Sequence, residues 1–257
     1  MNEPIWITPG EGRLKKMRWR VLTAATLLDG VLKRGGQRWQ AVMVTLTYAN
    51  ITDPDPRDIS KYLKNVREWM RRNGQTCRYV WTAELQQRGA LHYHVVFWMP
   101  RDMFMPKADK RGWWPHGHTR TERAKCGPAY IAKYVSKTAA VGDLGEIHEI
   151  PKGFRICGVG GLTERHRNWM AWCRLPAWLR PLVTSYHRMT PVNGGGWGSR
   201  LTGEFWPSPW RVEHFENGPM GRLVKLVPAF PDLELRPSKW WPDFTSSADM
   251  PSALTVY

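Results

Sequence analysis

One stretch of strict alternation constrains the fold of this chain more than any other. Residues 91–98 read LHYHVVFW, with large apolar side chains at every second position and two histidines between them. A period of two residues predicts a β-strand whose alternate side chains point to opposite faces. His92 and His94 then lie on the same face, where two imidazoles can share one metal ion. Because an isolated pair of this kind is more often exposed surface, its interpretation depends on its neighbours.

A second strand with a carboxylate at its end precedes this one. Residues 77–83 are predicted to form a strand, and the polar turn LQQRG joins it to residues 91–99 as an antiparallel pair. Glu84 stands eight residues before His92, so the hairpin brings it back to the same edge of the sheet. One carboxylate and two imidazoles form a mixed oxygen and nitrogen site that suits Mg²⁺ or Mn²⁺. Glu84, His92 and His94 are therefore the candidate metal ligands.

A predicted helix at residues 128–139 carries the sequence YIAKYVSK. Tyr130 and Tyr134 are spaced i and i+4, about 40° apart around the helix axis, and share one face. Lys133 and Lys137 each follow a tyrosine by three residues. A nearby ammonium stabilises a phenolate, whose ordinary pKa is about 10, and can hold a phosphate. The alternative is a basic amphipathic helix whose tyrosines cover the core.

The remaining pattern mixes strands and helices, which favours the α+β class. A helix is predicted to begin at Asp55 as N-cap with Pro56 at its first position, and to stop at Asn73. Trp69 lies on its apolar stripe and is expected in the core. The other predicted elements are a basic helix at 12–33, strands at 41–48, 118–123 and 154–158, and a helix at 163–172.

The charge of the chain is concentrated in its first part. The formal net charge is +16, from 38 Lys and Arg against 22 Asp and Glu. Residues 181–257 hold 7 basic and 7 acidic side chains, so residues 1–180 carry 31 against 15. Such a field attracts nucleic acid or an anionic membrane. The apolar stretch 21–32 is interrupted by Asp29 and is shorter than the roughly 20 residues that span a bilayer.

Three regions follow from composition. We expect a basic helical segment at 1–38, a main domain at 39–180, and a Pro/Gly/Trp-rich extension of unknown role at 181–257, in which Asn217 and Gly218 indicate a hairpin. The four cysteines form no CxxC pair and are expected to be reduced thiols. Residues 1–10 lack the pattern of a secretion signal, so we expect a cytoplasmic protein without membrane attachment.

The joint pattern resembles the HUH endonucleases, named for two histidines that flank a hydrophobic residue. Glu84, His92 and His94 match EX₇HxH, and residues 130–137 match YxxKYxxK. Residues 44–47, VTLT, look like the first motif of the family. The likeness covers residues 41–140 and is greatest to two-tyrosine initiators of small single-stranded DNA phages, including the gene A-type and filamentous-phage relatives.

The resemblance implies a fold and a reaction. It implies a ferredoxin-like (RRM-like) palm, in which helices flank a central antiparallel sheet and the tyrosine helix lies across the metal. Glu84, His92 and His94 would be the metal ligands, Tyr130 and Tyr134 the nucleophiles, and Lys133 and Lys137 their electrostatic assistants. The reaction would nick and rejoin single-stranded DNA through a 5′-phosphotyrosine and so initiate rolling-circle replication.

The resemblance also implies partners. The origin, near a hairpin, would be the DNA partner, and a host helicase and polymerase would take part because the chain has no GxxxxGK[ST] loop.

Two other functions remain open at this point. A non-catalytic single-strand-binding protein would explain the charge and the 16 tryptophans equally well. A relaxase or single-tyrosine transposase of the same superfamily would share the metal site. Trp113, Trp114, Trp169 and Trp172 are candidates for DNA contact. The second HxH, His116-Gly117-His118, is interpreted as a turn that enters a strand.

Overall fold

The computed structural model describes residues 5–7, 9–34, 38–50, 54–85, 90–140, 153–193, 195–218 and 221–228. It divides into two compact units, Arg13–Leu162 and Met1–Gly12 together with Thr163–Tyr257. The division into 1–38, 39–180 and 181–257 stays a prediction. No helix among the described residues is long and apolar enough to cross a membrane, and the cytoplasmic location stays a prediction.

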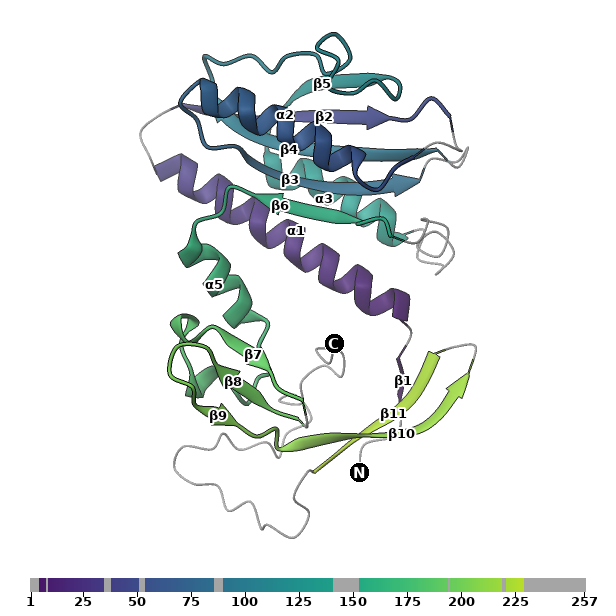
Figure 1. Ribbon diagram of the computed structural model, residues 1–257, viewed down its shortest axis with the longest axis vertical. Helices are drawn as coiled ribbons and strands as arrows, with labels where there is room; N and C mark the ends of the chain where they lie inside the picture. Colours follow the sequence, from purple (N-terminus) through teal and green to yellow (C-terminus); the bar gives the residue numbers. More distant parts are fainter. Residues whose placement is uncertain are drawn as a thin grey trace. The chain divides into compact units, whose positions relative to one another are not determined.

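A five-stranded sheet forms the centre of the Arg13–Leu162 unit (Figure 1). Its strands are β2 (Trp39–Thr47), β3 (Arg78–Leu85), β4 (Leu91–Pro100), β5 (Thr119–Ala124) and β6 (Cys157–Gly160). Their order is β5-β2-β4-β3-β6, and every neighbouring pair is antiparallel. All ten residues of β4 are buried, as its position at the middle of the sheet requires.

Helix α2 (Asp58–Arg72) covers one face of the sheet (Figure 1). Its buried apolar stripe includes Tyr62, whose ring meets that of Phe97 on β4 at 6.3 Å between centroids. The predicted N-cap was wrong: Arg57 holds that position, and the Asp55 carboxylate instead accepts a hydrogen bond of 2.8 Å from the Arg57 backbone N–H. Trp69 is half-buried beside Trp113, with 6.2 Å between the ring centroids.

Helices α1 (Pro9–Arg34) and α3 (Gly127–Ala140) contact the opposite face. Trp98 on β4 donates a hydrogen bond of 3.3 Å from Nε1 to the Asp29 carboxylate of α1. The first residue of α3, Gly127, lies so close to Trp98 that a Cβ there would be 2.7 Å from the indole. The histidines of β4 point to this face, because they alternate with the side chains that α2 covers.

The α+β class is confirmed, whereas the ferredoxin-like arrangement is not. A ferredoxin-like fold runs β-α-β-β-α-β. Here the chain runs β2-α2-β3-β4-β5-α3-β6, with an additional strand between β4 and the second helix. That strand, β5, takes the edge beside β2, and β6 pairs with β3 at the other edge.

The unit that contains residues 163–228 is built from short elements around an apolar cluster. These elements are α5 (Glu164–Cys173), η1 (Arg180–Leu182), η2 (Ser185–His187), β7 (Met189–Pro191), β8 (Trp197–Ser199), β9 (Phe205–Trp206), β10 (Trp210–Gly218) and β11 (Gly221–Pro228). β1 (Ile5–Ile7) completes a three-stranded sheet of order β1-β11-β10, and β7-β8-β9 form another. The predicted hairpin is confirmed, since Asn217 pairs with Arg222 and Gly218 with Gly221.

The candidate DNA-contacting tryptophans of this unit differ in exposure. Trp172 packs against the apolar cluster, which consists of Leu175, Trp178, Leu179 and Val183, and its Nε1 donates a hydrogen bond of 2.7 Å to the Val183 carbonyl. Trp169 is 41% exposed and so remains a candidate for DNA contact.

All four cysteines are free thiols, as expected.

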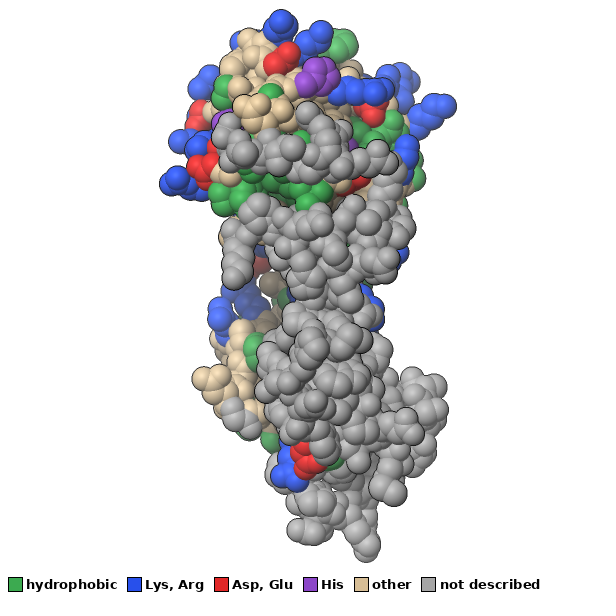
Figure 2. All heavy atoms as spheres, turned by 90° about the vertical axis from the view of Figure 1, so that its right-hand side faces the viewer, with side chains coloured by type: hydrophobic (Ala, Val, Ile, Leu, Met, Phe, Trp, Pro, Cys, Tyr) green, Lys and Arg blue, Asp and Glu red, His purple; other side chains and the backbone are tan. Residues whose placement is uncertain are grey.

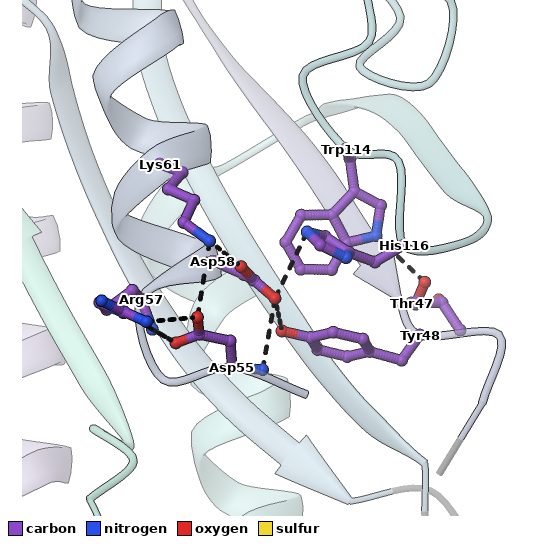
Figure 3. Close-up of polar contacts among 8 residues, drawn as sticks. All are labelled: Thr47, Tyr48, Asp55, Arg57, Asp58, Lys61, Trp114 and His116. Atoms are coloured by element: carbon purple, nitrogen blue, oxygen red, sulfur yellow. Dashed lines mark hydrogen bonds and ion pairs between the residues drawn. The ribbon is translucent and has the colours of Figure 1, made fainter. Parts of the chain in front are cut away.

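A buried carboxylate ties the second HxH to α2 rather than to a metal site (Figure 3). Asp58, with 1% of its side chain exposed, pairs with His116 at 3.3 Å and with Lys61 at 2.9 Å. Its Oδ2 also accepts a hydrogen bond of 3.1 Å from the Tyr48 hydroxyl. Gly117 is needed here because a Cβ would lie 2.4 Å from the Thr47 carbonyl oxygen.

Trp114 belongs to the same contact region. It is 1% exposed, and its Nε1 donates a hydrogen bond of 3.1 Å to the Thr47 carbonyl (Figure 3). The prediction that Trp114 contacts DNA was therefore wrong, because the hydrophobic effect and this bond place its indole in the core.

We expect Asp58→Ala to destabilise the chain by about 2 to 4 kcal/mol, because it removes a buried carboxylate that accepts from the Tyr48 hydroxyl and pairs with His116 and Lys61. The urea midpoint, followed by tryptophan fluorescence, measures this loss. Asp102→Ala is the matched control: Asp102 is exposed, so its removal should change stability by no more than about 0.5 kcal/mol. Equal midpoints for the two variants would contradict the structural role of Asp58.

Candidate active site

The carboxylate and the two imidazoles meet on one face of the sheet. Glu84 on β3 is directly opposite His92 on β4, as the hairpin interpretation predicted. His94 is diagonal to Glu84, and its Nε2 lies 3.0 Å from a Glu84 carboxylate oxygen. His92 and His94 are 7% and 6% exposed, so both are held inside the molecule rather than on its surface.

A third strand fixes the other side of His94. Thr45 of β2 is directly opposite His94, and its hydroxyl lies 3.3 Å from Nδ1. Both ring nitrogens of His94 therefore have a polar neighbour, one from each adjacent strand. Contacts of this kind fix the orientation and tautomer of an imidazole.

Helix α3 brings the two phenols to this cluster. The ring of Tyr134 stacks on that of His94, with centroids 3.8 Å apart and an interplanar angle of 24°. Tyr130 lies on the same side of the helix, with its ring centroid 6.5 Å from that of Tyr134. Ile131 and Val135 are fully buried and carry the packing of α3 against the sheet. Tyr130 and Tyr134 are half-buried, so the alternative in which the tyrosines cover the core stays open.

The structure adds two charged residues that sequence reasoning missed. On β5, Arg120 is opposite Thr45 and Glu122 is opposite Met43, which places both on the histidine face. The Tyr130 hydroxyl donates a hydrogen bond of 3.0 Å to Glu122, whose other oxygen pairs with Arg120 at 2.9 Å. Alternation in the predicted strand at 118–123 already placed Arg120 and Glu122 on one face. It did not indicate which neighbouring strand this strand would pair with.

These charges act on the phenols in opposite directions. The hydrogen bond to Glu122 raises the pKa of Tyr130, with burial and the Glu122 charge adding to the effect. Burial raises the pKa of Tyr134, and the charge of Glu122 raises it further. Arg120 lowers the pKa of both tyrosines. The cation that favours the phenolates in this arrangement thus comes from β5.

The two lysines of the tyrosine helix are placed less fully. Lys133 lies between the two tyrosines in the sequence of α3, and its side chain is exposed to solvent. The side chain of Lys137 lies outside the described residues. Their role as electrostatic assistants stays a prediction.

The donor set suits a divalent metal, although the side chains do not yet converge on one point. One carboxylate and two imidazoles are ordinary ligands for Mg²⁺ or Mn²⁺ when phosphate or water completes the shell. The rings of His92 and His94 have centroids 6.1 Å apart and are inclined by 58°. Within the described ranges, no three His, Cys, Asp or Glu side chains form a group that could hold a metal ion as they stand. Metal binding at Glu84, His92 and His94 stays a prediction.

Comparison with known families supplies an independent finding. Residues 41–139 match a family model described as that of the replication-associated protein ORF2. The matched segment begins in β2 and ends within α3. It therefore contains the whole polar cluster, which consists of Thr45, Glu84, His92, His94, Arg120, Glu122, Tyr130 and Tyr134. No curated protein and no solved structure matches the chain.

The opposing charges on β5 predict pKa shifts of opposite sign. We expect Glu122→Gln to lower the pKa of Tyr130 and Tyr134, because it removes the charge that disfavours their phenolates. Arg120→Gln should raise both values. NMR titration of protein labelled with ¹³Cζ-tyrosine measures each phenol, with assignment by Tyr130→Phe and Tyr134→Phe. Glu68→Gln, on α2, is the matched control and should shift neither; shifts of the same sign in the two β5 variants would refute the assignment.

Proposed function

We propose, from the replication-associated match of residues 41–139, that this chain nicks and rejoins single-stranded DNA to initiate rolling-circle replication. The observation that carries the proposal is the stacking of Tyr134 on His94, with ring centroids 3.8 Å apart. It brings a candidate nucleophile into contact with a candidate metal ligand, two groups that are 40 residues apart in the sequence. A protein that only binds DNA has no need for this contact.

The metal would be held by Glu84, His92 and His94, with His92 turning so that both imidazoles face one ion. A divalent ion bound there supplies Lewis-acid polarisation of a phosphate oxygen. Mg²⁺ and Mn²⁺ are the ions that fit the mixed donor set. Thr45, whose hydroxyl lies 3.3 Å from Nδ1 of His94, keeps that ring oriented.

The chain's own residues then carry the strand transfer. The Tyr130 hydroxyl passes its proton to Glu122, which already accepts its hydrogen bond at 3.0 Å. The phenol oxygen attacks phosphorus, the bond between phosphorus and the 3′ oxygen breaks, and the 3′ oxygen takes up the proton that Glu122 returns through water. The products are a 5′-phosphotyrosine ester and a free 3′-hydroxyl. Because an ester replaces an ester, the reverse reaction rejoins the strand without ATP.

The second phenol allows a second transfer. Tyr134 lies beside Tyr130 on one helix face, so it can attack the junction that replication regenerates while the first ester is still in place. Arg120 and Lys133 are cations that can hold the phosphate charge during each transfer. This tandem arrangement favours an initiator of the phage type over a relaxase or a single-tyrosine transposase.

The proposal includes the partners of the reaction. Single-stranded origin DNA, near a hairpin, is the substrate, and the host cytoplasm is the site of action. A host polymerase extends the free 3′ end, and a host helicase opens the duplex because the sequence has no GxxxxGK[ST] loop.

A covalent adduct tests the proposal directly. The full chain is incubated with a library of randomised single-stranded oligonucleotides labelled at the 3′ end, with Mn²⁺ or with EDTA. We expect an SDS-resistant labelled adduct that needs Mn²⁺ and that is enriched in one DNA sequence. The label must be at the 3′ end because the tyrosine retains the 5′-phosphate side of the nick.

Variants decide which residues perform the chemistry. The double variant Tyr130→Phe with Tyr134→Phe should form no adduct, and His92→Ala should reduce it to background while DNA binding persists. Tyr186→Phe is the matched control, since Tyr186 is 61% exposed and lies outside the polar cluster. An adduct that survives the double variant, or wild-type protein that shifts DNA without ever forming one, would refute the nicking function.

A further inference from the structure

A basic groove lies on the histidine face at the opposite end of the strands. It has a volume of about 1030 Å³, and α1, β2, β4, β5 and the start of α3 all contribute to its walls. Its polar and aromatic lining includes Asp29, Arg38, Trp39, Arg101, Arg123 and Lys125. None of these residues belongs to the candidate active site described above.

The charges of the groove favour an anion. Arg38, Arg101, Arg123 and Lys125 are all exposed, and none of them forms an ion pair with another described residue. One carboxylate opposes these four cations, and Asp29 already accepts a hydrogen bond of 3.3 Å from Trp98. Cations gathered around a concave surface raise the local concentration of a negatively charged ligand.

The beginning of α3 adds to this field. Gly127 lines the groove and is the first residue of a 14-residue helix. A helix N-terminus presents unpaired N–H groups and a partial positive charge, both of which suit a phosphate. The close approach of Gly127 to Trp98 leaves no room for a Cβ, which keeps the helix end against the groove wall.

Aromatic side chains beside the cations indicate single-stranded nucleic acid. Trp39 lines the groove, and the Arg78 guanidinium lies 5.1 Å from its ring centroid. Phe104 is 84% exposed in the segment after Arg101, and Gln40 holds that segment through a hydrogen bond of 2.7 Å to the Met103 carbonyl. Unpaired bases stack on exposed aromatic rings, whereas a duplex keeps its bases stacked on one another.

The groove is linked to the candidate active site by two elements. Trp98, in the groove wall, follows His94 by four residues on β4, which is about 13 Å along a strand. Tyr130 follows Gly127 by three residues on α3. A strand of DNA can therefore lie across both places on one face of the unit. Lys and Arg side chains are also spread over the face of this unit that Figure 2 draws.

We propose that this groove binds the phosphodiester backbone of the single-stranded origin, a few nucleotides from the phosphate that is cut. The inference rests on the proposed function and adds the surface that holds the substrate. The bound strand is gripped through its charge and through stacking, so the groove itself reads no base sequence. Register on the DNA then depends on contacts made elsewhere.

The salt dependence of binding tests the groove. Binding of a fluorescein-labelled 20-nucleotide oligo(dT) is followed by anisotropy over a series of NaCl concentrations, with EDTA present and in the Tyr130→Phe, Tyr134→Phe background so that no chemistry occurs. A plot of log K against log salt concentration has a negative slope. Removing one cation that neutralises a phosphate reduces the magnitude of that slope by about 0.7. We expect Arg38→Gln with Arg101→Gln, two exposed cations of the groove lining, to reduce the magnitude of this slope by about 1.4.

A matched control removes the same charge elsewhere. Arg71→Gln with Arg72→Gln, two exposed positions at the end of α2, should leave the slope unchanged. The proposal would be overturned if the groove variant had the same slope as the parent protein. It would also be overturned if the α2 variant lost as much slope as the groove variant. A 20-base-pair duplex that binds as tightly as oligo(dT) and is weakened as much in the groove variant would overturn it as well.

The two proposals fail in different ways. If the slopes change as expected but wild-type protein forms no adduct, the groove binds DNA and the nicking function is wrong. If the adduct forms but the groove variant keeps the parent slope, the nicking function stands and the groove proposal is wrong.

Discussion

Strand β4 is buried along its whole length, so each of its side chains must find a partner on one of two covered faces. On the α2 face the partners are mostly aromatic and aliphatic, and the Tyr93 hydroxyl is hydrogen-bonded to that of Tyr48. On the other face the apolar surface is interrupted by His92 and His94. A buried imidazole without polar neighbours is costly, so this face can exist only with polar groups on the adjacent strands. For His94, Glu84 and Thr45 supply them from either side.

The polar partners required on this face hold His94 in one defined position. His94 is held by Glu84, by Thr45 and by the stacked ring of Tyr134, which come from three different elements. Groups fixed from several sides lose little further freedom when a substrate binds, and that favours catalysis over adaptable binding. The outer edge of the cluster, with Glu122 and Arg120, is more open to solvent.

The parts of the site that the sequence predicted depend on local periodicity. Alternation placed His92 and His94 on one face, and the length of the hairpin placed Glu84 opposite His92. Helical spacing placed Tyr130 beside Tyr134. Each of these needs only the geometry of one element or one turn, which residue spacing encodes directly.

The parts that were missed depend on choices between distant segments. Arg120 and Glu122 joined the site because β5 pairs with β2, and no local pattern says which edge of a sheet a strand will take. Trp114 stands among basic residues in the sequence, as a DNA-contacting residue would. Its side chain is nevertheless buried, where it donates a hydrogen bond to the Thr47 carbonyl. The N-cap lies at Arg57 rather than Asp55, and Asp58, the first residue of the helix, contacts Tyr48 and His116, which come from distant segments.

Helix α3 has a mechanical consequence. Its first residue lines the basic groove, and Tyr134 stacks on His94, so one continuous helix of 14 residues joins the two places. A rod of this length transmits a tilt at one end to the other. A substitution that changes how Gly127 packs on Trp98 would therefore also change how Tyr134 lies on His94.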